Sequence, residues 1–144
     1  CWIGIHSRTS RKELNRSVLE GATFAMNDAV QLLKDRGLKM SQIRLSGGGA
    51  RSDFWRQLQA DIYGTTCATI NSEEGPAYGA ALLAATGCGE FSSIKQACDS
   101  AIKVIRTIKP TAAGKKLYAK LYAQYVKLYP ALKDEFAMIA QMGL

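Results

Sequence analysis

Apolar side chains recur at helical spacing along the first quarter of the chain, and polar residues occupy the positions between them. The apolar series is Leu14, Val18, Ala22, Ala25, Ala29, Leu32 and Leu33. Ser10 and Glu13 have the spacing of a capping box, in which each side chain accepts a hydrogen bond from the other residue's backbone N–H. Gly37 is a typical residue after a helix C-terminus. The pattern therefore predicts one long amphipathic helix that begins at Ser10 and ends near Gly37.

Short runs rich in apolar and β-branched residues alternate with further helical patterns. The runs predicted to be strands are residues 1–5, 43–46, 65–70 and 104–110. Helices are predicted over residues 51–63, 77–84 and 111–129, with a short one that begins at Ser92 or Ser93. Strands that alternate with helices in this way predict a single α/β domain over residues 1–144.

The helix predicted over residues 51–63 has a clear apolar spacing and a clear end. Its expected inner face consists of Phe54, Leu58 and Ile62. Gly64 follows as the stop signal. We interpret Asp53 and Asp61 as a helix-start charge or solvent-facing residues, with no catalytic role.

Four tyrosines form one stripe on the helix predicted over residues 111–129. They are Tyr118, Tyr122, Tyr125 and Tyr129. Such a stripe can stack nucleic-acid bases, but we interpret it as a face that packs on the body of the domain. Pro130 is expected to break this helix, with a short C-terminal helix after it.

The net charge of +7 is compatible with an anionic partner such as a nucleotide or a nucleic acid. The cations, however, lie mostly at polar helix positions among acidic residues, which favours solvated faces. We therefore predict no nucleic-acid partner. No apolar run approaches the roughly 20 residues that cross a bilayer, so no membrane partner is predicted either.

The four cysteines and the single His6 show no spacing typical of a metal site. Unpaired thiols of this kind favour a reduced, cytoplasmic protein. Because the chain starts with Cys1 and an apolar, strand-like stretch, we expect it to be part of a longer polypeptide.

The segment Gly47-Gly48-Gly49-Ala50 stands between a predicted strand and a predicted helix. Consecutive glycines allow a sharp turn and close approach of a ligand to the backbone, and the start of a helix favours an anion such as phosphate. No Lys-Ser or Lys-Thr follows as in a Walker A loop. Ser52 also replaces the third glycine of the dinucleotide fingerprint, which disfavours an NAD-dependent oxidoreductase. A tight turn without a ligand remains an alternative.

A second group of small residues lies in Glu74-Gly75-Pro76-Ala77-Tyr78-Gly79-Ala80-Ala81. Gly79 within a helix costs roughly 1 kcal/mol relative to alanine. We interpret this stretch as a helix that packs closely against a neighbour.

Taken together, these segments resemble the C-terminal domain of the FGGY carbohydrate kinases. The resemblance rests on ordered motifs along nearly the whole chain. They are Gly4-Ile5 followed by Glu13-Leu14 and Ser17-Val18-Leu19-Glu20, then residues 45–57, 60–64 and 74–81, and finally Tyr125 with Leu128-Tyr129-Pro130-Ala131-Leu132, as in kinases that act on xylulose.

The resemblance implies the C-terminal part of the ribonuclease H-like, actin-like ATPase fold, with a mixed sheet and packed helices. It implies an enzyme that transfers the γ-phosphoryl group of ATP, with Mg²⁺ bound through the phosphates, to a ketopentose such as xylulose. By this resemblance the ATP-binding residues are Gly47, Gly48, Gly49, Ala50, Ser52 and Gln57.

The family's catalytic base and most sugar contacts belong to an N-terminal domain that this sequence does not include. The resemblance therefore places no catalytic residue here, and the fragment alone is predicted to be inactive. The alternative is a noncatalytic scaffold relative with a vestigial nucleotide site. An exposed apolar sheet edge is also expected, and it would favour a homodimer.

Overall fold

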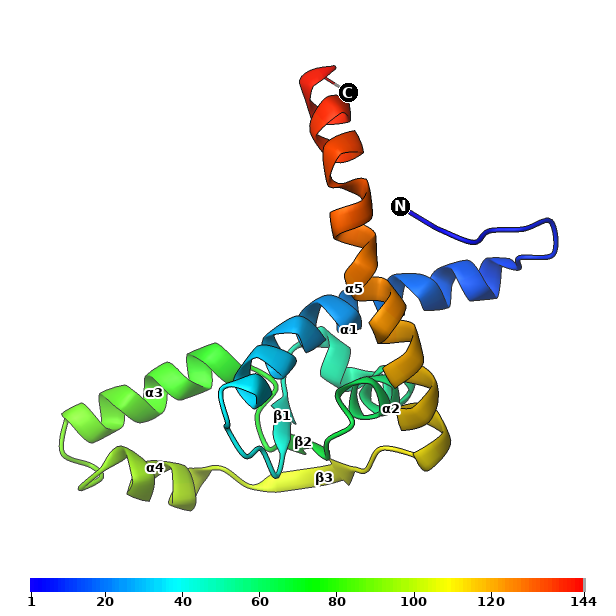
Figure 1. Ribbon diagram of the computed structural model, residues 1–144. Coiled ribbons are helices and arrows are strands. Elements are labelled where there is room, and N and C mark those ends of the chain that lie inside the picture. The colour runs from blue at the N-terminus through cyan, green and yellow to red at the C-terminus, as the bar shows by residue number, and fades with distance from the viewer. Residues whose placement is uncertain (144) are drawn as a thin grey trace.

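The computed structural model describes residues 1–143, and five α-helices pack around and beside a small sheet (Figure 1). The elements in chain order are α1 (Arg11–Asp35), β1 (Ile43–Leu45), the 3-10 helix η1 (Gly48–Arg51), α2 (Asp53–Tyr63), β2 (Cys67–Ile70), α3 (Gly75–Gly87), α4 (Ile94–Ala101), β3 (Val104–Ile108) and α5 (Ala112–Gln141). The predicted alternation of strands and helices is confirmed.

The sheet has three strands in the order β1-β2-β3. β1 runs parallel to β2, with Leu45 opposite Thr69, whereas β2 and β3 are antiparallel. The sheet is therefore mixed, as expected. On the edge strand β3, Ile105 is 66% exposed, so this edge presents apolar side chains; its pairing with a second copy stays a prediction.

Both predicted ends of α1 are confirmed by specific hydrogen bonds. The backbone N–H of Ser10 donates to Glu13 Oε2 (2.7 Å), and the Glu13 N–H donates to Ser10 Oγ (3.3 Å). At the other end Gly37 has φ of 81°. The N–H of Leu38 donates to the carbonyl of Leu33 (3.1 Å), which is the bonding pattern of a Schellman motif.

Aromatic side chains from α1 and α5 form the centre of the core, together with residues of α2. The Phe24 ring centroid lies 6.1 Å from that of Tyr118 and 5.1 Å from that of Tyr125. The first three tyrosines of the stripe thus pack on the body of the domain, as predicted. Tyr129, the fourth, is exposed.

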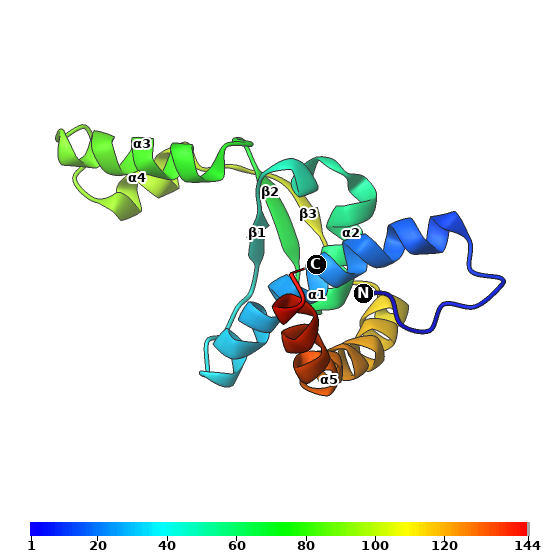
Figure 2. The same cartoon turned by 90° about the horizontal axis from the view of Figure 1, so that it is seen from above.

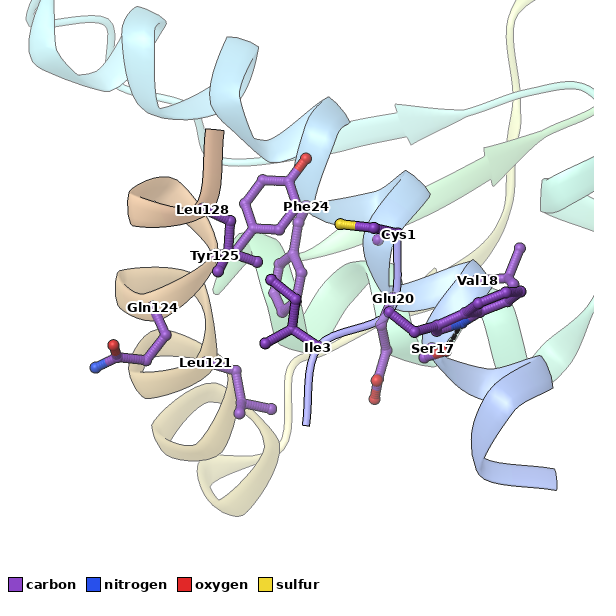
Figure 3. A pocket seen from close by; sticks show the side chains of 12 residues that line it. Cys1, Ile3, Ser17, Val18, Glu20, Phe24, Leu121, Gln124, Tyr125 and Leu128 are labelled. Atoms are coloured by element: carbon purple, nitrogen blue, oxygen red, sulfur yellow. Dashed lines mark hydrogen bonds between the residues drawn. The ribbon is translucent and has the colours of Figure 1, made fainter. Parts of the chain in front are cut away.

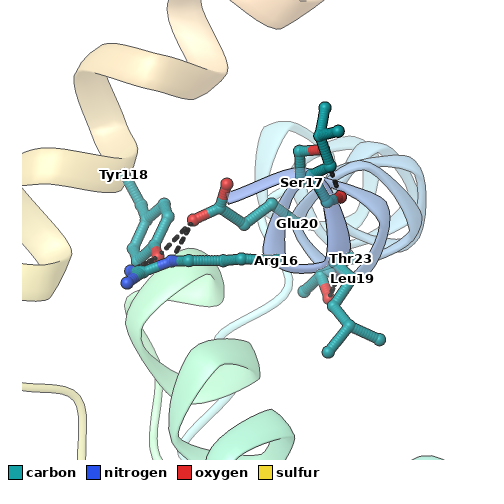
Figure 4. A network of polar contacts seen from close by, with 7 residues as sticks. Arg16, Ser17, Leu19, Glu20, Thr23 and Tyr118 are labelled. Carbon is teal, nitrogen blue, oxygen red and sulfur yellow. Dashed lines mark hydrogen bonds and ion pairs between the residues drawn. The ribbon is translucent and has the colours of Figure 1, made fainter. Parts of the chain in front are cut away.

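A polar network joins α1 to α5 beside this aromatic cluster (Figure 4). Arg16 donates to Glu20 Oε1 (2.8 Å) and to the hydroxyl of Tyr118 (2.6 Å), which in turn donates to Glu20 Oε1 (2.7 Å). The hydrogen bond to Tyr118, followed by that to Glu20, raises the pKa of Arg16. Burial raises the pKa of Tyr118. The network pairs these three polar side chains with one another where the two helices meet.

Helix α5 runs without interruption through Pro130 and projects from the body of the domain (Figure 1). The predicted break at Pro130 is therefore wrong. Proline removes one backbone hydrogen bond to the preceding turn, but the turns on both sides keep theirs, so the helix continues. Its last turns expose apolar side chains such as Phe136 and Ile139.

The predicted strand over residues 1–5 is also wrong, because this segment forms no strand and lies against helices (Figure 3). The Trp2 indole donates to Ser17 Oγ on α1 (3.0 Å). With Phe24 and Tyr125, the segment borders a mostly apolar hollow of about 560 Å³. A strand needs a partner strand, and this stretch lies beside α1 instead of beside the sheet.

Helices α3 and α4 pack on one another and extend away from the sheet as an arm (Figure 2). A Cβ added at Gly79 would meet no atom within 4 Å, so the close packing expected at this glycine is not found. The close approach occurs at Gly75, where a Cβ would lie 2.8 Å from Ser46 Oγ. None of the helices within residues 1–143 is long and apolar enough to cross a membrane.

Candidate functional site

The glycine turn lies at the end of β1, between the sheet and α2. Gly47 has φ of 76° and ψ of −170°, a conformation that L side chains rarely adopt, so glycine is needed there. Its N–H donates to the carbonyl of Glu73 (3.3 Å), and its carbonyl accepts from the N–H of Ala50 (3.0 Å). The turn is thereby tied to the loop that follows β2.

A hollow of about 580 Å³ opens beside this turn. It is lined by the end of β1 with the turn, the first turns of α2, the end of β2 with the loop that follows it, and β3. The lining includes Gly47, Ala50, Asp53, Arg56, Thr69, Ile70, Ser72, Glu73, Ile105 and Arg106. Its size falls within the roughly 300–1,000 Å³ of small-molecule sites, and it combines apolar walls with charged groups.

The charged groups of the hollow are paired with one another. Arg51 Nη2 lies 2.6 Å from Glu73 Oε2. Asp53 Oδ1 contacts both Arg56 and Arg106, the latter at 2.5 Å. With three guanidinium groups and two carboxylates, this rim has an excess of one positive charge, which suits an anionic guest.

Two of the glycines differ in what surrounds them. A Cβ added at Gly49 would lie 3.1 Å from the Trp55 ring, whose indole donates to Thr23 Oγ1 (2.9 Å). A Cβ at Gly48 would meet no atom within 4 Å. A side chain at Gly49 would therefore meet the ring of Trp55. Of the two, Gly48 is the one that faces open space.

Comparison with known proteins identifies the family. The model of the FGGY family of carbohydrate kinases, C-terminal domain, matches residues 1–88, which include β1, the turn, α2, β2 and α3. The chain belongs to the FGGY carbohydrate kinase family.

Individual FGGY kinases match most of the chain. It is 37% identical over 133 residues to the xylulose kinase of Staphylococcus epidermidis, and this alignment covers 92% of the chain and 27% of that protein. It is 30% identical over 143 residues to the L-xylulose/3-keto-L-gulonate kinase of Escherichia coli, which covers 99% of the chain and 29% of that protein. The chain thus spans less than a third of the length of these relatives.

The fold of this FGGY chain is also found in a solved structure. Ligand-bound xylulose kinase from Lactobacillus acidophilus superposes with a TM-score of 0.87, 24% identity, and coverage of 96% of this chain and 28% of that one. The predicted fold class and the predicted family are therefore both confirmed.

The structure brings two of the six residues predicted to bind ATP into the lining of the hollow, Gly47 and Ala50. Gly48 and Gly49 belong to the same turn. Ser52 is the N-cap of α2, where its hydroxyl accepts from the Trp55 N–H (3.3 Å). The ATP-binding role of all six stays a prediction.

Gln57, the sixth predicted residue, lies on a different face of α2. Its amide nitrogen donates to Asp61 Oδ1 (3.0 Å) and to the carbonyl of Lys109 (3.1 Å). Asp61 also accepts from the Thr111 N–H (2.6 Å) and is 9% exposed. Our interpretation of Asp61 as solvent-facing is therefore wrong, because it anchors the start of α5. Asp53 does lie at the helix start, as expected, with its side chain 81% exposed.

The expected inner face of α2 needs one further correction. Leu58 and Ile62 are buried, but Phe54 is 50% exposed, with the Arg16 guanidinium 5.8 Å from its ring centroid. Arg56 is buried instead. Arg56 and Arg106 also line the hollow, and neither was predicted as a site residue from the sequence. The spacing of Asp53 and Arg56, typical of a helix ion pair, is the one local signal that could have indicated the first of them.

Within residues 1–143, no three His, Cys, Asp or Glu side chains gather closely enough to hold a metal ion. All four cysteines are free thiols, and Cys67 is the buried one.

Proposed function

We propose that this chain supplies the nucleotide-binding part of an ATP-dependent sugar kinase that phosphorylates a ketopentose such as xylulose. The observation that carries the proposal is the glycine turn at the end of β1, which opens on a hollow of suitable size in a chain that belongs to the FGGY family. The named sugar rests on relatives that are xylulose kinases.

The hollow suits the adenosine end of ATP. Ile70 and Ile105 offer apolar surface for a base, and the backbone of Gly47 and Ala50 offers close approach to the ribose and the first phosphate. The excess positive charge on the rim favours the phosphates. Mg²⁺ would be held through those phosphates, where it neutralises the charge that develops during phosphoryl transfer.

The contribution of this chain to the reaction is affinity and position. Phosphoryl transfer depends mostly on holding the nucleotide, the metal and the acceptor hydroxyl in line. The residues of the hollow bind and orient the nucleotide, and we assign no general base among them. The base and the sugar contacts would come from the region of the FGGY kinases that precedes this domain.

The proposal is tested by Gly48→Val in the full-length protein that contains this sequence. Gly48 has no positive φ and faces open space, so valine is accommodated by the fold but projects from the turn. We expect ATP affinity to fall by about tenfold or more, because a ligand beside the turn loses close contact with the backbone. Calorimetric titration measures the change.

The matched control is Gly87→Val at the end of α3, which also faces open space but lies away from the hollow. It is expected to bind ATP like the wild type. Equal ATP affinity of the Gly48→Val variant and the wild type would contradict the proposed site.

A further inference from the structure

Arg56 is a charged residue enclosed by the fold at the edge of the hollow. It comes from the first turns of α2 and is 8% exposed. Its Nη1–H group donates to the carbonyl of Ala50, and Nη2 pairs with the carboxylate of Asp53. One guanidinium thus links the last part of the glycine turn to the start of α2.

Arg56 is buried, and burial is energetically unfavourable for a charged side chain. Burying a guanidinium is unfavourable unless its charge and its N–H groups are matched. Arg56 shares its carboxylate with Arg106, and within residues 1–143 its Nε–H group has no hydrogen-bond partner. A methionine of similar length could fill this position without that cost, so packing alone does not account for an arginine there.

Other contacts also hold the turn, since Arg51 pairs with Glu73 and the Trp55 ring lies against Gly49. The 3-10 helix η1 is four residues long, and such short elements have weaker hydrogen-bond geometry than an α-helix. Two backbone bonds hold Gly47, one to Ala50 and one to Glu73. The carbonyl of Ala50 is held by Arg56.

Fixing this carbonyl has a consequence for the ligand side of the turn. Ala50 lines the hollow together with Gly47 and Arg51, and the peptide unit that joins Ala50 to Arg51 is planar. An arginine that holds the Ala50 carbonyl therefore fixes the orientation of a peptide unit that borders the hollow.

We propose that Arg56 is a positioning residue for the nucleotide, which holds the Gly47–Ala50 turn in the shape that ATP binds. The inference rests on the proposed function, since it concerns the same hollow. Arg56 acts through the backbone, without a contact to the reacting atoms. Asp53 completes the arrangement, because it pairs with Arg56 on α2 and with Arg106 on β3 and so connects the turn to the far wall of the hollow.

The test compares Arg56→Met, Arg56→Lys and Arg106→Met with the wild type in the full-length protein. For each, ATP affinity is measured by calorimetry, kcat and the two KM values by a coupled kinase assay, and folding by thermal denaturation. Arg56→Met keeps the apolar stem and removes both bonds. Arg56→Lys keeps the charge, but a single ammonium group cannot reproduce the forked geometry of arginine. Arg106→Met removes one charge and one partner of Asp53 while leaving the Ala50 carbonyl held.

We expect Arg56→Met to raise the Kd and KM for ATP by about tenfold or more, as is typical when a hydrogen bond to a charged group is lost. The KM for sugar and the kcat should change by less than about threefold, since a fixed turn binds the nucleotide without taking part in chemistry. Arg56→Lys should retain the fold and still lose ATP affinity by several fold. Arg106→Met should lose clearly less than Arg56→Met.

Two results would overturn the inference while leaving the proposed function intact. The first is that Arg56→Met and Arg56→Lys both bind ATP as tightly as the wild type. If Arg56→Met does not fold, wild-type ATP affinity in Arg56→Lys alone has the same meaning. The other is an equal loss in Arg106→Met and Arg56→Met, which would indicate a general charge effect. A wild-type protein that binds no ATP would instead refute the proposed function, and this inference with it.

Discussion

The two ends of helix α2 have opposite surroundings. At its N-terminal end, Asp53 and Arg56 border the hollow and make their bonds to charged groups and to the glycine turn. At its C-terminal end, residues from Leu58 to Tyr63 are all buried, and Lys34 of α1 donates to the Tyr63 carbonyl (2.7 Å). One helix thus connects a ligand-sized opening to the aromatic core.

This difference indicates that affinity and stability depend on separate ends of the same helix. The core end is held by apolar burial, which is the dominant stabilising term in folding. The turn end is held by a few hydrogen bonds and ion pairs, which fix the conformation of the glycine turn. Substitutions at the core end should therefore change the free energy of unfolding, and those at the turn end should change ATP affinity.

Phe24→Ala should cause the largest loss of stability. The Phe24 ring is 7% exposed and lies among three tyrosine rings next to Leu58 and Tyr63. Truncating a buried phenylalanine costs about 3–5 kcal/mol of unfolding free energy, which urea denaturation measures. Phe54→Ala is the control, because that ring is half-exposed at the other end of α2. Similar losses in both variants would show that the two ends do not differ.

Asp61→Asn should have an intermediate effect. Asp61 Oδ1 accepts from Thr111 N–H and from Gln57 Nε2. The oxygen of an asparagine could accept both, but it lacks the negative charge that strengthens these hydrogen bonds. The expected loss is about 1–3 kcal/mol of unfolding free energy. Asp99→Asn, on the exposed face of α4, is the matched control and should change stability little. An unaffected Asp61→Asn variant would remove this anchor from the account.

High pH should gradually lower the free energy of unfolding, because two buried groups of the core then lose their protons. Burial raises the pKa of Tyr63 from 10.0 to about 12 and that of Cys67 from 9.0 to about 12. Both groups hold their protons more tightly when folded, so their contribution is complete below about pH 9 and is lost as the pH rises toward about 12. The urea concentration at the midpoint of unfolding should therefore decrease as the pH rises from about 9 to about 12. Cys67→Ala should make the fall shallower, and a constant midpoint would contradict the assignment.

The parts of the fold that follow from the sequence are those set by local bonds. The ends of α1 were predictable because Ser10, Glu13 and Gly37 act within one or two turns of the helix. The turn at Gly47–Ala50 was predictable for the same reason, since consecutive glycines between a strand and a helix have few other uses.

The errors concern contacts between distant segments. Residues 1–5 have strand-like composition, but a strand depends on a neighbour that composition does not reveal. Phe54 has the right spacing for an inner face, yet its ring is half-exposed beside Arg16 of α1. Arg56 and Arg106 reach the hollow because α2 and β3 converge on Asp53, 53 residues away from Arg106 in the sequence. Charged residues at such meeting points carry no sequence pattern of their own.

The most direct test of the account is calorimetric titration of ATP, ADP and NAD, with magnesium, into the full-length protein that contains this sequence. The account predicts that ATP and ADP bind, that NAD does not, and that Gly48→Val weakens both adenine nucleotides while its unfolding free energy stays close to that of the wild type. Binding of NAD in preference to ATP, or ATP binding that is indifferent to Gly48→Val, would contradict the assignment of this hollow to the nucleotide.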